Sequence, residues 1–141
     1  MSEQQLIFTK EEVETYLARV RYALKDKNTK VSLQTNREVD RGRDIRFTSQ
    51  FTISNIFPDE DPTDVLKREI GTLSVENYMY SLKDKRHENR SDFYVFAKMY
   101  DDFVYIKFRV ELISIKGAYI FVMSFHYSDK PIDNSCFPYL R

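Results

Sequence analysis

The sequence predicts an α+β fold, with N-terminal helices packed on a C-terminal antiparallel β-meander. Three observations predict it: residues 9–26 have the spacing of an amphipathic helix, three runs after residue 92 alternate with a period of two, and the joins between those runs are of hairpin length. At 141 residues the chain fits one domain and is too short for two separate cores. We therefore expect residues 1–141 to form a single domain.

The first helix is expected over residues 9–26. Thr9 and Glu12 have the spacing of a capping box, and Phe8 and Val13 stand where a hydrophobic staple closes. Apolar residues then recur at three- and four-residue intervals, namely Val13, Tyr16, Leu17, Val20 and Leu24. This stripe is expected to contact the core.

The middle of the chain predicts a second helix and two short strands. Asp61 directly precedes Pro62, which is typical of a helix start, and the helix is expected to end at Gly71. Ser74 is expected to cap a further turn. Short strands are expected over residues 31–34 and 45–53, separated by a charged loop at 37–44.

The meander is expected to comprise strands 93–100, 103–112 and 118–126. In the middle strand Val104, Ile106, Phe108, Val110 and Leu112 share one face, and Tyr105, Lys107, Arg109 and Glu111 share the other. One face should meet the helices and the other should meet solvent or a ligand. In the third strand, simple alternation places Ile120, Val122, Ser124 and His126 together.

Composition restricts the classes of function. Lys plus Arg total 22 and Asp plus Glu total 22, so no overall field attracts nucleic acid or an anionic membrane, and any nucleic-acid site must be local. The lone Cys136 excludes an internal disulfide, and the N-terminus has no secretory pattern. No apolar run approaches ~18 residues, the minimum for a membrane span. We expect a soluble protein of the reducing cytoplasm.

Metal and phosphate-loop chemistry are not indicated. A zinc site would need Cys136, His87 and His126, and their spacing is not that of zinc ligands. The three glycines are isolated, so there is no glycine-rich phosphate loop, and no G-x-S-x-G motif is present. We therefore expect no metal and no cofactor.

A set of basic and aromatic side chains on the predicted sheet remains as the candidate site. If the three strands are ordered as a meander, one concave patch could gather Tyr105, Lys107, Arg109, Lys98 and His126. Lys98, Arg109 and Lys83 are the residues expected to bind the substrate. Metal-free RNA cleavage needs a base for the 2′-hydroxyl, cations for the transition-state charge and an acid for the 5′-oxygen. In the other interpretation, the charged residues of the middle strand merely solvate an exposed face and His126 is a structural strand-end residue.

The sequence resembles the motility quorum-sensing regulator (MqsR) toxin family. The resemblance covers residues 64–139 and lies in four blocks, Leu73-Ser74-Val75-Glu76-Asn77-Tyr78, Asp92-Phe93-Tyr94-Val95-Phe96-Ala97-Lys98, Val104-Tyr105-Ile106-Lys107-Phe108 and Val122-Met123-Ser124-Phe125-His126. It implies a RelE-like, barnase-type α+β fold, an mRNA-cleaving toxin without metal, and a cognate antitoxin. The family's active-site tyrosine falls on Tyr105, the neighbouring lysine on Lys107, and the later basic residue on His126, which replaces a lysine. The resemblance thus implies that Tyr105, Lys107 and His126 are the catalytic residues.

The chain also departs from the family pattern. A family lysine falls near Tyr80, with Lys83 the nearest substitute, and the family glutamine has no counterpart closer than Val95 or Lys98. Residues 27–60 exceed the family's usual length. These departures and the zero net charge support a second hypothesis, in which the chain is a non-catalytic protein-binding module, such as a phage-encoded inhibitor that grips a protein with its aromatic sheet face.

Overall fold

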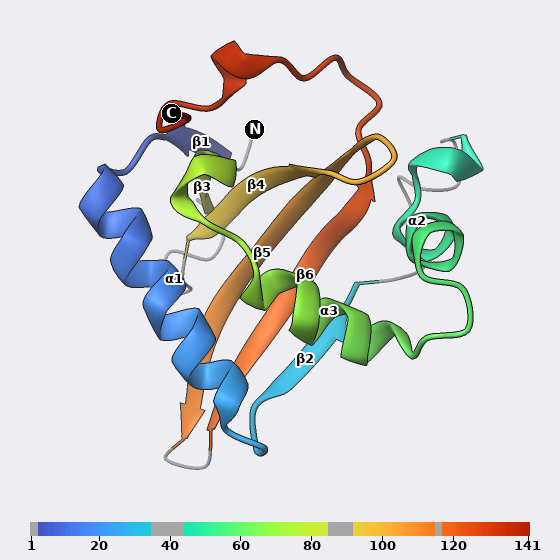
Figure 1. Ribbon diagram of the computed structural model, residues 1–141. Helices are drawn as coiled ribbons and strands as arrows, with labels where there is room; N and C mark the ends of the chain where they lie inside the picture. Colours follow the sequence, from blue (N-terminus) through green and yellow to red (C-terminus); the bar gives the residue numbers. More distant parts are fainter. Residues whose placement is uncertain (1–2, 35–43, 85–91, 115–116) are drawn as a thin grey trace.

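The protein is a six-stranded mixed sheet with helices on one face (Figure 1). The computed structural model describes residues 3–34, 44–84, 92–114 and 117–141. The strand order is β1-β3-β4-β5-β6-β2, in which all neighbours are antiparallel except β6 and β2. The strands are β1 (Glu3–Leu6), β2 (Lys30–Leu33), β3 (Tyr78–Asp84), β4 (Phe93–Met99), β5 (Phe103–Ser114) and β6 (Gly117–Tyr127).

The α+β class and the three-strand meander are confirmed, but the sheet is larger than expected. β4, β5 and β6 are the three predicted strands, and β2 corresponds to the strand expected at 31–34. The sequence analysis did not predict β1 or β3, which extend the sheet beyond β4. Of the charged loop expected at 37–44, only Asp44 lies within the described residues. Within the described ranges, no helix has both the length and the apolar character that crossing a membrane requires.

Helix α1 (Lys10–Lys25) begins as the sequence predicts. The Thr9 hydroxyl accepts the Glu12 amide at 3.1 Å, and the Glu12 carboxylate accepts the Thr9 amide at 3.0 Å. Val13, Leu17 and Val20 are buried against the sheet. The predicted apolar stripe is therefore a core contact.

Helix α3 (Pro62–Gly71) is also confirmed, with the Asp61 carboxylate accepting the Asp64 amide at 3.2 Å. After it comes a short 3₁₀ turn, η3 (Val75–Asn77), which leads directly into β3. The Asn77 side chain accepts the Ser74 amide at 2.9 Å. The turn expected after Ser74 is therefore the entry to a strand.

The strand expected at 45–53 is wrong, because this segment is helical. It forms a 3₁₀ turn, η2 (Ile45–Phe47), and helix α2 (Ser49–Ile56). Two hydroxyls of α2 accept edge amides of β6: Ser49 accepts from Phe125 at 3.0 Å, and Thr52 accepts from Tyr127 at 2.9 Å. β2 pairs only with residues 119–122 of β6, so α2 covers the next part of that edge.

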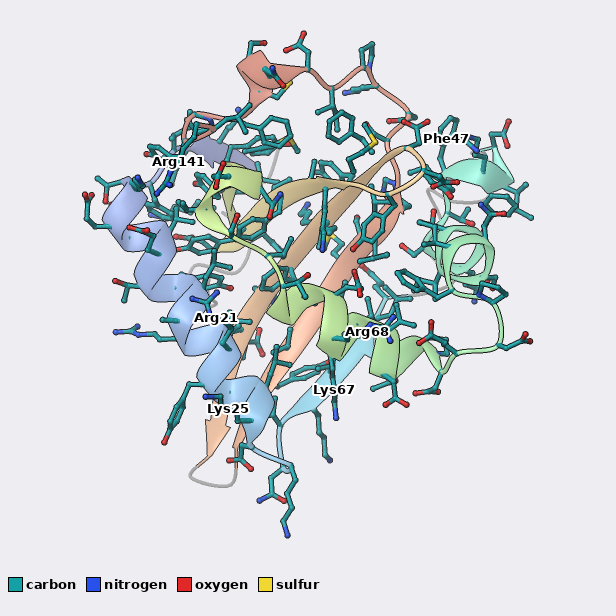
Figure 2. All side chains as sticks on the ribbon, viewed as in Figure 1. Arg21, Lys25, Phe47, Lys67, Arg68 and Arg141 are labelled. Atoms are coloured by element: carbon teal, nitrogen blue, oxygen red, sulfur yellow. The ribbon has the colours of Figure 1, made fainter. Side chains whose placement is uncertain are left out.

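A buried carboxylate joins α3 to the end of β4. Glu69 has a relative exposure of 8% and accepts hydrogen bonds from the Tyr100 hydroxyl at 2.6 Å and from Arg68 Nε at 2.9 Å. The Lys98 ammonium lies 3.7 Å from the same carboxylate. Figure 2 labels Arg68 on α3, and its side chain is 47% exposed. Burial acts to raise the pKa of Glu69, but the hydrogen bonds from Tyr100 and Arg68 outweigh it and lower the pKa.

We expect Glu69→Gln to lower the free energy of unfolding by about 1–3 kcal/mol at neutral pH, since buried hydrogen bonds to a charge are lost. The pKa of Glu69 is lower in the folded protein than its ordinary value of 4.5, so its contribution is present above pH 4.5 and is lost as the pH falls through the folded value. Urea unfolding of wild type and variant over this pH range measures the difference.

The matched control is Glu14→Gln, which neutralises an exposed carboxylate on α1. It should change stability little at any pH. A Glu69→Gln deficit that stays constant down to acid pH would contradict the ionised-carboxylate account.

Candidate functional site

The face of the sheet opposite the helices contains a pocket of about 350 Å³. Val104, Ile106 and Phe108 of β5 pack under the helices, so the alternate residues face the other way. The floor of the pocket includes Tyr80 of β3, Tyr105 and Lys107 of β5, and Ser124 and His126 of β6. One wall is the segment after β6, which contributes Ser128, Asp129, Lys130 and Ile132. We call residues 128–141 the C-terminal segment; it returns along one end of the sheet toward β1 (Figure 1).

Three aromatic side chains meet in the pocket floor. Tyr105 and His126 are paired across β5 and β6, and their rings are stacked with centroids 5.5 Å apart. The Tyr80 and Tyr105 hydroxyl oxygens lie 3.1 Å apart, within hydrogen-bond distance. The structure thus brings together Tyr105, Lys107 and His126, the three residues that the sequence singled out for catalysis.

A β-bulge in β6 turns Ser124 and His126 into this pocket. The pairing with β5 passes from Lys107↔Ser124 to Phe108↔Val122, which leaves Met123 as an extra residue. Ile120 and Val122 before the bulge, and Phe125 and Tyr127 after it, belong to the core under the helices. The expectation that Ile120, Val122, Ser124 and His126 share a face is therefore wrong, because the bulge reverses the alternation.

A second bulge, in β3, does the same for Tyr80. Tyr78 pairs with Phe96 and Tyr80 with Val95, so Met79 is the extra residue. Tyr78 is fully buried in the core under the helices, whereas Tyr80 lines the pocket. Without the offset, Tyr78 and Tyr80 would point to the same face.

The main chain fixes which nitrogen of His126 carries a proton. Nδ1 lies 2.8 Å from the Tyr127 carbonyl oxygen. A carbonyl only accepts hydrogen bonds, so Nδ1 is the donor in this contact, and Nε2 carries the lone pair whenever the ring is neutral. His126 is therefore held in the tautomer in which Nε2 can accept a proton.

Lys107 is a buried cation in the pocket floor. Its relative exposure is 8%, and its ammonium lies 4.9 Å from the centre of the Phe93 ring. It pairs with Val95 on β4 and with Ser124 on β6. The interpretation that this face of β5 is simply solvated is therefore wrong for Lys107.

Arg109 is close to the pocket in sequence but is not one of its lining residues. Its guanidinium lies 4.7 Å from the Phe93 ring and 5.2 Å from the Phe121 ring, and its exposure is 5%. Arg109 Nε is 2.9 Å from a carboxylate oxygen of Glu111. Arg109 therefore belongs to an aromatic cluster further along β5, and its predicted role in binding substrate is not supported by its position.

Lys98 and Lys83 are also outside the pocket. Lys98 lies on the helix side of β4, where its ammonium donates to the Thr72 hydroxyl at 2.8 Å. Strand alternation separates it from the face of Tyr105, so the expected patch of five residues does not form. Lys83 is exposed near the end of β3 and does not line the pocket.

The sequence analysis missed Tyr80, Ser124 and the wall of the C-terminal segment. The third strand of the meander is followed directly by three polar residues, Ser128-Asp129-Lys130. This pattern could have indicated a site at the end of that strand. The Ser128 hydroxyl donates to the Lys130 carbonyl at 2.7 Å, which fixes this turn. Tyr80 had appeared only as a departure from the family pattern.

The pocket combines hydroxyls, two ammonium groups and an imidazole, which suits an anionic ligand such as a phosphodiester. Of the lining residues that the structure describes, Lys107 and Lys130 supply two positive charges and Asp129 one negative charge. Among the described residues, no group of three His, Cys, Asp or Glu side chains is placed to hold a metal ion. His87, a member of the zinc set considered from the sequence, lies outside the described residues.

We expect nitrogen-15 NMR to find the neutral His126 ring protonated at Nδ1 and not at Nε2, because the Tyr127 carbonyl accepts from Nδ1. The chain has two histidines, and a His126→Gln variant assigns the signals by the set that disappears. A neutral ring protonated at Nε2 would contradict the proposed proton acceptor.

A scan against protein-family models, a search of curated proteins and a search of solved structures each found no match to this chain. The pocket and the sequence resemblance are therefore the observations that bear on function.

Proposed function

We propose that the pocket is the active site of a metal-independent endoribonuclease that cleaves mRNA. The observation that carries the proposal is the convergence of Tyr105, Lys107 and His126, from two strands, on one pocket. The resemblance to the MqsR family supplies the rest: a RelE-like fold, a type II toxin–antitoxin role, a cognate antitoxin as partner, and the cytoplasm as the setting in which mRNA is met.

His126 is the general base in this proposal. Its Nε2 takes the proton of the 2′-hydroxyl, and the 2′-oxygen then forms a bond to phosphorus. The hydrogen bond from Nδ1 to the Tyr127 carbonyl supports the imidazolium that results. The ring is held by its stacking on Tyr105, so it needs little reorientation.

Tyr105 and Lys107 act on the leaving 5′-oxygen and on the non-bridging phosphate oxygens. The bond from phosphorus to the 5′-oxygen breaks, and the Tyr105 hydroxyl gives its proton to that oxygen. Lys107 stabilises the negative charge that develops on the non-bridging oxygens, and its burial strengthens this interaction. The products are a 2′,3′-cyclic phosphate and a 5′-hydroxyl, with the net proton returned through solvent.

The neutral charge of the chain is compatible with a local RNA site. Among the described residues, two lysines and one carboxylate line the pocket, although the chain as a whole has equal numbers of acidic and basic residues. The face beside the pocket weighs against the protein-binding alternative, because Phe93 and Arg109 have exposures of 2% and 5% and offer little open surface for a partner.

We expect the purified protein to cleave single-stranded RNA in excess EDTA and to leave cyclic phosphate ends. Removing a general acid or base should slow cleavage by about 100-fold or more, so His126→Ala and Tyr105→Phe should each do so. Cleavage is followed on labelled RNA, and the product ends are identified by mass spectrometry.

Induced expression should arrest growth, and the same two variants should relieve the arrest at equal soluble levels. Activity that is lost on chelation and restored by magnesium or manganese would contradict the metal-independent mechanism. Equal toxicity of wild type and both variants would contradict the assigned residues.

A second prediction separates the two lysines that the sequence grouped together. Affinity for RNA should fall with salt, and Lys107→Gln should make the log-log slope shallower by roughly 0.7, the value for one phosphate contact on a single strand. Lys98→Gln should leave the slope unchanged, since Lys98 lies on the helix side and contacts Thr72.

Both variants lose one positive charge, so each is the control for the other. Binding is measured by fluorescence anisotropy at several salt concentrations with an uncleavable 2′-deoxy substrate. If both variants change the log-log slope of affinity against salt equally, RNA binds somewhere other than the pocket. If the protein binds no RNA even at low salt, the ribonuclease proposal is overturned.

A further inference from the structure

We propose that Tyr80 is a positioning residue for the general acid: its hydroxyl donates a hydrogen bond to the Tyr105 oxygen and directs the Tyr105 proton toward the leaving 5′-oxygen. This inference rests on the proposed ribonuclease function. It adds a residue that sequence reasoning did not assign to the site.

Two residues of β4, Val95 and Ala97, lie between the strands that carry Tyr80 and Tyr105. Val95 pairs with Tyr80 on one side and with Lys107 on the other, and Ala97 pairs with Tyr105. Tyr80 and Tyr105 are therefore on strands that flank β4, about 10 Å apart at the backbone. Two phenol side chains reach over the small residues between them and bring their oxygens to 3.1 Å.

The contact lies over an apolar surface. Val95 and Ala97 have exposures of 0% and 1%, and Phe137 of the C-terminal segment packs against the same cluster. Tyr80 and Tyr105 are half-buried at the edge of this cluster. A hydrogen bond in such a setting is stronger than one in water, and a charge that forms there depends more on its donors.

The bulge at Met79 is what makes the contact possible. It turns Tyr80 away from the core face occupied by Tyr78 and toward Tyr105. Bulges are frequent beside active sites, where they redirect a side chain. The β3 strand therefore contains a local irregularity whose effect is to place one hydroxyl beside the general acid.

The direction of the hydrogen bond follows from the reaction. When the phosphorus–oxygen bond breaks, the Tyr105 proton moves to the 5′-oxygen and negative charge remains on the phenol oxygen. A hydrogen-bond donor at that oxygen stabilises this charge, and the Tyr80 hydroxyl is within reach. If Tyr80 donates to Tyr105, the Tyr105 hydrogen is not directed at Tyr80, so one contact both restricts the orientation of the acid and stabilises its conjugate base.

The test compares two RNA substrates that differ in one atom. The first has the natural 5′-oxygen, and the second has sulfur at the bridging 5′-position, whose thiolate leaves without needing a proton. Tyr80→Phe should slow the first reaction by about 10- to 100-fold, the usual effect of losing a hydrogen bond to a charged group. On the sulfur substrate Tyr80→Phe should cleave at close to the wild-type rate.

Three further variants make the result specific. Tyr105→Phe should show the same pattern more strongly, and the Tyr80→Phe/Tyr105→Phe double variant should be no slower than Tyr105→Phe alone, because Tyr80 acts through Tyr105. His126→Ala should remain slow on both substrates. Tyr119→Phe removes a hydroxyl that contacts Ser32 on β2, outside the pocket, and should leave both rates unchanged.

The outcomes separate this inference from the proposed function. A wild-type protein that cleaves neither substrate overturns the ribonuclease proposal and the inference with it. If the wild type cleaves both substrates and Tyr80→Phe is equally slow on both, or as fast as wild type on both, the ribonuclease proposal stands. The proposed role of Tyr80 is then overturned. Affinity for the 2′-deoxy substrate should be the same in wild type and Tyr80→Phe, and a large loss would mean that Tyr80 binds substrate directly.

Discussion

The one-residue offsets in β3 and β6 are the constraint on which the candidate site depends. In a regular strand every second residue faces the helices, and the apolar residues there bury the core. The extra residues Met79 and Met123 reverse the alternation partway along each strand. β3 therefore buries Tyr78 under the helices and still presents Tyr80 to the pocket. β6 likewise buries Phe125 and Tyr127 and presents Ser124 and His126 to the pocket.

The site also depends on how its charges are distributed between the two faces. On the helix side, Lys98 lies against Glu69 and Thr72, where it helps to join α3 to β4. On the pocket side, Lys107 is held in the floor beside Phe93. A chain with no net charge can still present lysines in one pocket, because the field close to the surface depends on the local placement of charges and not on their sum.

Much of the fold could be predicted from local signals. The capping box at Thr9 and the Asp61–Pro62 start identified α1 and α3, because these signals act within one turn of helix. The strand predicted at 45–53 was wrong: Thr48 caps α2 locally, with its hydroxyl accepting the Phe51 amide, and two hydroxyls of α2 accept amides at the edge of β6. Tyr105, Lys107 and His126 were grouped correctly, but Lys98 and Tyr80 were not. The face of Lys98 depends on the hairpin register that pairs it with Val104, and the face of Tyr80 depends on the bulge at Met79, and neither leaves a periodic signal in a single sequence.

The bulge at Met123 has an evolutionary consequence. Even-numbered residues of β6 face the core before the bulge, and odd-numbered residues face it after the bulge. Substitution of Ser124 or His126 can therefore alter the chemistry of the pocket without changing a residue under the helices. Loss of one residue there is a different event. It would move two aromatic side chains out of the core and two polar ones into it, at a cost that a marginally stable domain could not absorb. The packing of this strand therefore constrains its length as well as its composition.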